Sequence, residues 1–193
     1  MKNIYLIGGG GHCRSCIDVI EQEGRYQIKG IFDALYPQNK DVFGFPIIGK
    51  DEDIEKYVSP DNYFLITIGQ IKNSEVRVKF FELLKGLEAQ FATVISPRAY
   101  VSKHSRIGEG TIVMHGALVN ANSVVERNCI INTNALIEHD VFVGDHCHIA
   151  TAAVINGHCT VNDRSFVGSN SVFKQGISIA PGSIIQAGSV QLG

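Results

Sequence analysis

Every sixth residue from Ile95 to Ile185 is apolar, and this spacing constrains the fold of the C-terminal half more than any other feature. The sixteen positions are Ile95, Val101, Ile107, Val113, Val119, Val125, Ile131, Ile137, Val143, Ile149, Ile155, Val161, Val167, Phe173, Ile179 and Ile185. Because 45% of all residues are hydrophobic, chance gives such a run in a fixed register on the order of once in a few hundred thousand trials. A helix, with a period of about 3.6 residues, cannot produce it.

A second regularity follows each apolar position by four residues. These sites hold the small residues Ala99, Ser105, Thr111, Ala117, Ser123, Cys129, Ala135, Cys147, Ala153, Cys159, Ser165, Ser171, Ser183 and Ser189, and only Val141 and Ile177 break the series. An aliphatic side chain for the interior and a small one near a tight corner are typical of the hexapeptide β-helix. Three hexads close one triangular coil, so equivalent residues of successive coils should stack at roughly 4.7–4.9 Å. We therefore predict a left-handed parallel β-helix over residues 93–193.

The first 92 residues follow a different pattern, in which β-prone runs alternate with helical segments. The pattern predicts strands over 2–7, 28–32 and 63–68, an extended segment over 42–49, and helices over 12–23, 51–57 and 74–87. Alternation of this kind is typical of a small parallel α/β sheet. We therefore expect an α/β domain over residues 1–92.

Composition and charge exclude several classes of partner. The net charge is -2 and no run of Lys and Arg is present, which disfavours nucleic acid and anionic membranes as partners. No apolar run approaches the roughly 20 residues of a membrane span, and the N-terminus lacks a signal peptide, so a cytoplasmic protein is expected. Five cysteines, an odd number, argue against a disulfide framework, and we interpret Cys13 and Cys16 as structural thiols.

The candidate catalytic residues are exceptions to the repeat. His139 is followed by Asp140 and stands in the segment NTNALIEHD; a histidine beside a carboxylate can act as a general base, although a lone histidine can also be an ordinary surface residue. His146 and His148 could suggest metal ligands, but no third ligand is evident and no metal is expected. The remaining β-helix histidines, His104, His115 and His158, are interpreted as polar wall residues.

The spacing of His139 and His148 predicts an assembly. They are nine residues apart, half of a coil, and so should lie on different sides of one prism. They could then meet only across chains. A threefold assembly would place sites in the clefts between neighbouring prisms.

Four glycines, Gly8–Gly11, end the first strand before a helix, and such a turn lets backbone amides approach a phosphate. Cys13 stands where the dinucleotide fingerprint has its third glycine, and no P-loop motif is present, so an NAD-linked enzyme or an NTPase is disfavoured. The alternative is that the glycines serve only to form a tight turn and bind no phosphate. Asp33, at the end of the second strand, is placed to meet a ribose or base.

Taken together, the turn GGGGH, the FD pair at 32–33, the segment ISPRA at 95–99, and His139 with His148 resemble the sugar acetyltransferases of the bacillosamine-pathway and sialic-acid-acetylating type. The resemblance covers nearly the whole chain. It implies a Rossmann-like N-terminal domain that holds a nucleotide-linked sugar, and a β-helix that binds acetyl-CoA as co-substrate between the subunits of a homotrimer.

The resemblance also implies roles for individual residues. His139 corresponds to the general base and Asp140 to its acidic neighbour, where relatives usually have Glu. His148 corresponds to a contact of the acetyl carbonyl and Gly157 to a backbone amide near the thioester. The implied sugar-nucleotide or site-lining residues are Gly11, His12, Asp33, Gly69, Arg77 and Asn132. Three extra residues between Gly69 and Arg77 depart from the pattern. Relatives continue into a Gly-x-Pro-Ala-Lys tail that helps to cover CoA, whereas this sequence ends at QLG, which implies a truncated chain or a more open site.

The hypothesis that follows is N-acetylation of a nucleotide-linked amino sugar for surface glycan synthesis. Two alternatives stay open at this point. The same residues could serve O-acetylation of sialic acid or another surface sugar, because a hydroxyl also needs a base. A non-catalytic β-helix scaffold that binds a nucleotide sugar is the third reading.

Overall fold

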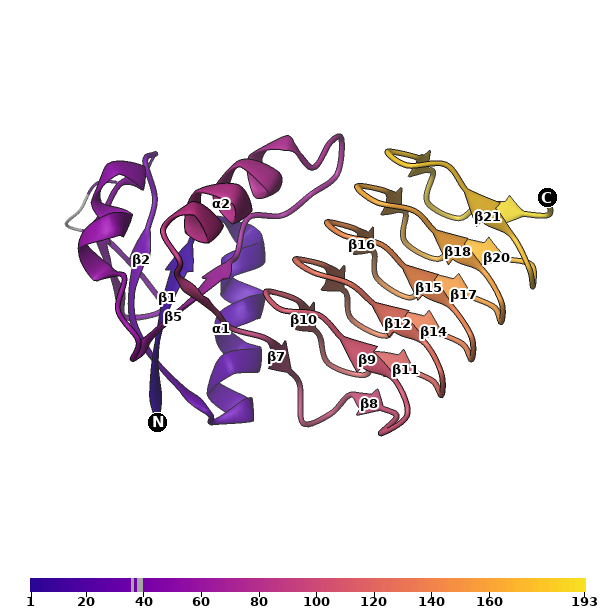
Figure 1. Ribbon diagram of the computed structural model, residues 1–193, viewed down its shortest axis with the longest axis horizontal. Helices are drawn as coiled ribbons and strands as arrows, with labels where there is room; N and C mark the ends of the chain where they lie inside the picture. The colour runs from indigo at the N-terminus through magenta and orange to yellow at the C-terminus, as the bar shows by residue number, and fades with distance from the viewer. Residues whose placement is uncertain (36, 38–39) are drawn as a thin grey trace. The chain divides into compact units, whose positions relative to one another are not determined.

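The computed structural model describes residues 1–35, 37 and 40–193 and is shown in Figure 1. By their contacts these residues divide into two compact units, one of residues 1–69 and 76–92 and the other of residues 70–75 and 93–193. Residues 70–75, which the sequence pattern placed with the α/β domain, thus pack with the β-helix.

The first unit contains a Rossmann-like sheet with strand order β3-β4-β2-β1-β5-β6. Its strands are β1 (Lys2–Ile7), β2 (Tyr26–Phe32), β3 (Asp41–Val42), β4 (Phe45–Gly49), β5 (Asn62–Ile66) and β6 (Gln90–Phe91). All neighbours are parallel except the β3–β4 hairpin. The predicted parallel sheet is therefore confirmed, and the extended segment at 42–49 is a hairpin.

In the part of the chain that the structure describes, three helices accompany this sheet: α1 (Gly11–Glu23), the 3-10 helix η1 (Asp51–Tyr57) and α2 (Glu75–Gly86). Helix α1 begins at the last residue of the glycine turn and ends at Glu23, and the left-handed φ of 70° at the C-cap residue Gly24 lets the Gly24 N–H bond to Ile20 O, as glycine C-caps do. An apolar cluster that includes Tyr5, Phe32 and Phe80 packs η1 and α2 against the strands. Among the residues described, no helix is long and apolar enough to span a bilayer.

The second unit is a left-handed parallel β-helix made of two-residue strands in three walls (Figure 1). The β7 wall contains β7 (Val94–Ile95), β10 (Ile112–Val113), β13 (Ile130–Ile131), β16 (His148–Ile149), β19 (Phe166–Val167) and β22 (Ile184–Ile185). The β8 wall contains β8 (Tyr100–Val101), β11 (Leu118–Val119), β14 (Leu136–Ile137), β17 (Val154–Ile155), β20 (Val172–Phe173) and β23 (Val190–Gln191). The β9 wall contains β9 (Arg106–Ile107), β12 (Val124–Val125), β15 (Phe142–Val143), β18 (Thr160–Val161) and β21 (Ser178–Ile179).

The six-residue apolar series forms the interior of this prism. Each of its members is the second residue of a strand, and those from Val113 to Phe173 are fully buried in one cluster. Parallel pairing joins residues one coil apart, as in Ile130 with His148. The predicted register is confirmed, and it follows from the need to stack large side chains inside and leave the corners to small ones.

Every corner from residue 110 to residue 188 contains one residue with positive φ, again with period six. The series is Gly110, Gly116, Asn122, Asn128, Asn134, Asp140, His146, Ala152, His158, Arg164, Asn170, Gly176, Gly182 and Gly188. Gly and Asn adopt this left-handed backbone most easily, which explains why they dominate it. Asp140 and His158 are therefore corner residues rather than members of a wall.

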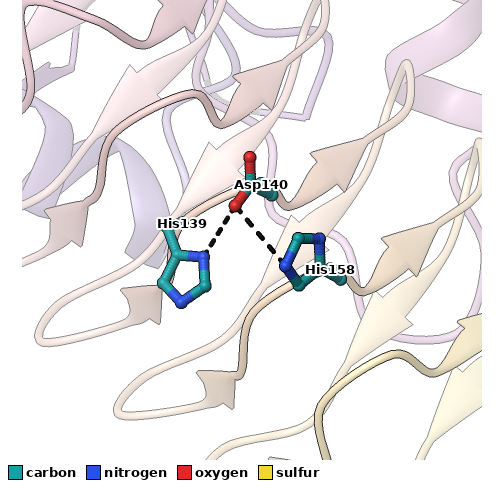
Figure 2. A group of neighbouring side chains, drawn as sticks. All are labelled: His139, Asp140 and His158. Atoms are coloured by element: carbon teal, nitrogen blue, oxygen red, sulfur yellow. Dashed lines mark hydrogen bonds and ion pairs between the residues drawn. The ribbon is translucent and has the colours of Figure 1, made fainter.

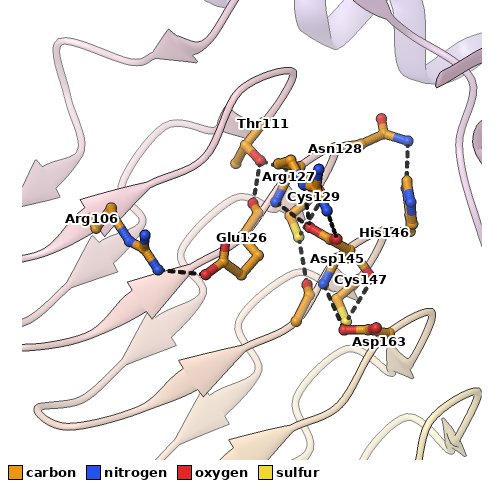
Figure 3. Close-up of polar contacts among 11 residues, drawn as sticks. Arg106, Thr111, Glu126, Arg127, Asn128, Cys129, Asp145, His146, Cys147 and Asp163 are labelled. Carbon is orange, nitrogen blue, oxygen red and sulfur yellow. Dashed lines mark hydrogen bonds and ion pairs between the residues drawn. The ribbon is translucent and has the colours of Figure 1, made fainter. Parts of the chain in front are cut away.

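Where the small residue carries a hydroxyl or thiol, it can also donate a hydrogen bond to a carbonyl of the next coil. Thr111 Oγ1 donates to Glu126 O at 2.8 Å, Cys129 Sγ to Gly144 O at 3.1 Å, and Cys147 Sγ to Asn162 O at 3.2 Å. Thr111 and the two cysteines are drawn in Figure 3. This position thus favours Ser, Thr and Cys for their donor as well as for their size.

Candidate active site

The corner between β14 and β15 holds His139 and Asp140 side by side (Figure 2). Nδ1 of His139 lies 2.7 Å from Oδ2 of Asp140. The other carboxylate oxygen, Oδ1, accepts a hydrogen bond of 2.6 Å from Nδ2 of Asn122, which occupies the same corner one coil earlier. The two residues could not both point this way on a flat strand. They do so because the strand ends at Ile137 and Asp140 has a φ of 60°.

These contacts keep the Asp140 carboxylate charged and fix the histidine tautomer. The hydrogen bonds from Asn122 and His139 hold the pKa of Asp140 below its ordinary value of 3.8. An ionised carboxylate accepts only, so the proton of neutral His139 lies on Nδ1. The lone pair of His139 is then on Nε2, which accepts no hydrogen bond from the described residues. About half of the His139 side chain, 49%, is exposed, so a substrate could reach this nitrogen.

Gly157 and His158 lie one coil further along the same corner. The His139 ring rests on Gly157 so closely that a Cβ at residue 157 would come within 2.7 Å of Cε1. The His158 ring stands edge-on to that of His139, with ring centroids 5.4 Å apart, and its Nε2 is 3.6 Å from Asp140 Oδ2. Neither Asn122 nor His158 was predicted from the sequence as a site residue. Each lies 18 residues, or one coil, from Asp140, and this spacing could have indicated that the three share one corner.

His148 belongs to β16 in the β7 wall, so the chain itself does not bring it to the His139 corner. Its Nδ1 donates to the backbone carbonyl of Gln70 at 2.6 Å, and Asn132 Nδ2 lies 3.1 Å from its Nε2. The ring is 7% exposed and packs edge-on to Phe166. His148 and Asn132 thus form a pair of their own.

The two histidines of the H-x-H motif have different partners. His146 is a corner residue whose Nδ1 lies 2.9 Å from Nδ2 of Asn128, as Figure 3 shows, while His148 contacts Gln70 and Asn132. Each ring therefore contacts the side-chain amide of a different asparagine, Asn128 for His146 and Asn132 for His148. The motif is explained by packing and hydrogen bonding.

In the first unit, Asp33 braces the glycine turn. Its Oδ2 accepts from the Gly9 N–H at 2.7 Å and its Oδ1 from the Leu35 N–H at 2.8 Å. Gly8 adopts a φ of 99° and lies against Ile68. The turn leads directly into the N-terminus of α1 at Gly11, and the N-termini of helices favour anions.

The other sugar-nucleotide candidates divide into two groups. Gly69 lies beside His12, since a Cβ at residue 69 would be 3.6 Å from that of His12, so both border the glycine turn. Arg77 is only 1% exposed, and its Nη1 donates to the carbonyls of Ile66 and Ile68 at 2.8 and 2.7 Å. Its position indicates that Arg77 holds the end of β5.

All five cysteines are buried, and among the described residues none is in a disulfide. Burial raises the pKa of Cys13 to about 11 and raises that of Cys16 as well. Thiols in this state are poor nucleophiles and metal ligands. The geometry therefore favours a structural reading of the C-x-x-C motif.

Comparison with known proteins adds family information to this geometry. Residues 3–84 match the family model of the PglD N-terminal domain. A UDP-N-acetylbacillosamine N-acetyltransferase of Bacillus subtilis (strain 168) is 33% identical over 117 residues, which cover 59% of this chain and 52% of that relative. The chain thus spans about half the length of this curated relative.

Solved structures also match this chain over its whole length. The acetyltransferase domain of PglB from Neisseria gonorrhoeae FA1090 is 28% identical with a TM-score of 0.91, and the match covers 100% of this chain and 92% of that one. PerB from Caulobacter crescentus, in complex with CoA and GDP-perosamine, is 29% identical with a TM-score of 0.90 and coverages of 100% and 89%. The family resemblance read from the sequence is confirmed. Both structural matches span the Rossmann-like sheet as well as the β-helix, because each covers 100% of this chain.

Proposed function

We propose that this chain transfers an acetyl group from acetyl-CoA to the amino group of a nucleotide-linked amino sugar. The observation that carries the proposal is the His139–Asp140 pair, in which an ionised carboxylate fixes Nδ1–H and leaves Nε2 open as a proton acceptor. The named activities of the relatives give the reaction class, because a B. subtilis relative is an N-acetyltransferase and a structural neighbour was solved with CoA and GDP-perosamine.

In this mechanism His139 Nε2 accepts a proton from the sugar amine as the amine nitrogen attacks the thioester carbonyl. A C–N bond forms, and when the tetrahedral intermediate collapses the C–S bond breaks and the thiolate of CoA leaves. Asp140 stabilises the imidazolium through the 2.7 Å hydrogen bond, and the imidazolium then protonates the leaving thiolate. No covalent acetyl-enzyme is needed.

The other proposed contacts follow from where the residues lie. The glycine turn with Gly11, His12 and Gly69 would receive the nucleotide phosphates, because helix N-termini favour anions. Asp33 would act by shaping this turn through its bond to the Gly9 N–H. The backbone amide at Gly157 would lie near the thioester, since this residue adjoins the base.

We propose that the working enzyme is a homotrimer. His139 and His148 lie on different walls of one prism, so the His148–Asn132 pair of one subunit could approach the His139 corner of its neighbour and contact the acetyl carbonyl there. Because acetyl-CoA and nucleotide sugars are cytoplasmic metabolites, we place the reaction in the cytoplasm. Sedimentation velocity would test the trimer, and a monomer with full activity would contradict it.

The direct test is a substrate screen. The full chain is incubated with acetyl-CoA and UDP- or GDP-linked amino sugars, and the product is identified by mass spectrometry. The expected result is a mass increase of one acetyl group at the amine for one sugar of this class. Acetylation only of hydroxyl groups on free sialic acids would instead support O-acetylation, and no transfer to any sugar would support the non-catalytic scaffold.

A further inference from the structure

We propose that His139, Asp140 and His158 form a binding site for a divalent first-row transition metal such as Zn²⁺, and that a bound metal prevents His139 from acting as a base. The binding is independent of the proposed acetyl transfer, whereas the inhibition rests on it. The site uses His158, for which the proposed reaction has no need.

The three donor atoms converge from two successive coils of one corner (Figure 2). One ligand atom from each residue lies within 4.8 Å of the others. The measured pairs are 2.7 Å from His139 Nδ1 to Asp140 Oδ2 and 3.6 Å from that oxygen to His158 Nε2. A tetrahedral Zn²⁺ with bonds of 2.0–2.1 Å requires ligand atoms about 3.3 Å apart. These two separations lie on either side of this value, and the two imidazole nitrogens are no more than 4.8 Å apart.

The side chains can make the remaining adjustment because none is locked by burial. The exposed fractions are 49% for His139, 32% for Asp140 and 57% for His158. Small rotations of the two imidazoles would equalise the distances. The same exposure gives an ion a path to the site and leaves room for a water molecule as the fourth ligand.

The donor set suits zinc rather than a harder cation. Two imidazole nitrogens and one carboxylate oxygen are typical zinc ligands, whereas Mg²⁺ prefers six oxygen ligands. Asn122 fixes Oδ1 of Asp140 and so directs Oδ2 toward both histidines, the type of outer contact that orients metal ligands.

Metal binding would remove the base by changing the tautomer of His139. Nδ1 now carries the proton that is bonded to Asp140. A metal on Nδ1 displaces that proton, and neutral imidazole then carries its one proton on Nε2. The nitrogen that must accept a proton from the amine would thus be occupied, with no oxidation or reduction.

Binding is tested by calorimetric titration of the untagged full chain with Zn²⁺, without CoA, whose thiol binds zinc. We expect one Zn²⁺ per chain, at least about tenfold weaker binding in His158→Asn, and no change in His104→Asn. Asn suits the left-handed φ of 59° at residue 158. His104 is the matched control, an exposed histidine in the same corner column whose backbone N–H bonds to Ser102 Oγ. Absence of binding in the wild type, or equal affinity in His158→Asn, would overturn the proposal.

Inhibition is measured on the acetylated sugar by mass spectrometry, because a thiol assay would itself respond to zinc. Zn²⁺ should inhibit wild type reversibly, with recovery on adding EDTA, and His158→Asn should need at least about tenfold more Zn²⁺ for the same inhibition. Mg²⁺ should have no effect. If no sugar is acetylated, the proposed function fails while the calorimetry still decides the metal site. Equal inhibition of the wild type and His158→Asn would overturn the inhibitory role.

Discussion

The imidazole of His139 rests on the backbone of Gly157, with no room for a side chain between them. A Cβ at residue 157 would come within 2.7 Å of Cε1 and 3.0 Å of Nε2 of His139. The position of the proposed base is therefore set by the absence of a side chain one coil away. This relationship links the stacking of the β-helix to the chemistry at its corner.

Gly157→Ala should impair activity more than stability. The added methyl group meets the end of an exposed side chain, which can move away at little cost in folding free energy, but a base displaced by about 1 Å can lose about a hundredfold in rate. We expect kcat to fall by about 10–100-fold with an almost unchanged melting temperature.

The contrasting variant is Gly168→Ala, whose Cβ would meet backbone atoms of Ala187 and Ile185 at 2.5 and 2.7 Å. Backbone cannot yield as a side chain can, so this variant should lose roughly 1–3 kcal/mol of unfolding free energy. Differential scanning calorimetry compares the two. Equal destabilisation by both substitutions would contradict this account of Gly157.

Asp140→Asn should lower activity. The hydrogen bonds from Asn122 and His139 hold the pKa of Asp140 below its ordinary value of 3.8, so the carboxylate stays ionised above about pH 5. The substitution removes the charged acceptor that fixes the proton of His139 on Nδ1. We expect kcat/KM to fall at least about tenfold with an unchanged melting temperature. A wild-type kcat/KM would contradict the pairing of these residues.

The Arg127–Asp145 pair, drawn in Figure 3, should make stability depend on acid pH. Burial raises the pKa of Asp145, but the side-chain and backbone hydrogen bonds from Arg127 outweigh it and leave the pKa below 3.8. A carboxyl with a lowered folded pKa stabilises the fold above its unfolded pKa, and this contribution disappears as the pH falls through the folded pKa.

Asp145→Asn should therefore cost up to about 1 kcal/mol at pH 7, and the difference from wild type should shrink below about pH 4. Urea unfolding at several pH values measures this. A difference that stays constant down to the acid transition would show that the charge does not matter.

Cys129 tests whether the small residue of the hexad acts as a hydrogen-bond donor. Its Sγ donates to Gly144 O at 3.1 Å. Cys129→Ser keeps a donor and should therefore lose less unfolding free energy than Cys129→Val. Cys129→Val fills similar space but leaves the buried carbonyl short of a partner, at about 1–3 kcal/mol. If Val is tolerated as well as Ser in chemical denaturation, size alone explains this position.

The period of six predicted the β-helix, its register and its interior, because each apolar residue occupies the equivalent inward-facing position of its strand. The corner series is visible in the sequence only in part, because His146, Ala152, His158 and Arg164 interrupt the run of Gly, Asn and Asp at intervals of six. The contact between His139 and Asp140 depends on this series, since the left-handed φ of Asp140 turns the two side chains together.

The site in the first unit was harder to predict for another reason. Asp33 and Arg77 stand where ligand contacts are expected, yet both bond to the backbone of their own unit. A sequence pattern gives the position of a charged residue along a strand or helix. It does not show whether that residue contacts a ligand or a nearby backbone amide or carbonyl, because this choice depends on how the loops fold.

The most direct test of the central claim is acetyl transfer by His139→Ala, with His104→Ala as the matched control in the same corner column. If Nε2 of His139 is the base, kcat should fall by about 10²–10⁴-fold while oligomeric state, CoA binding and melting temperature remain those of wild type, because the side chain is half exposed. The control should keep wild-type turnover. Wild-type turnover in His139→Ala would contradict the account.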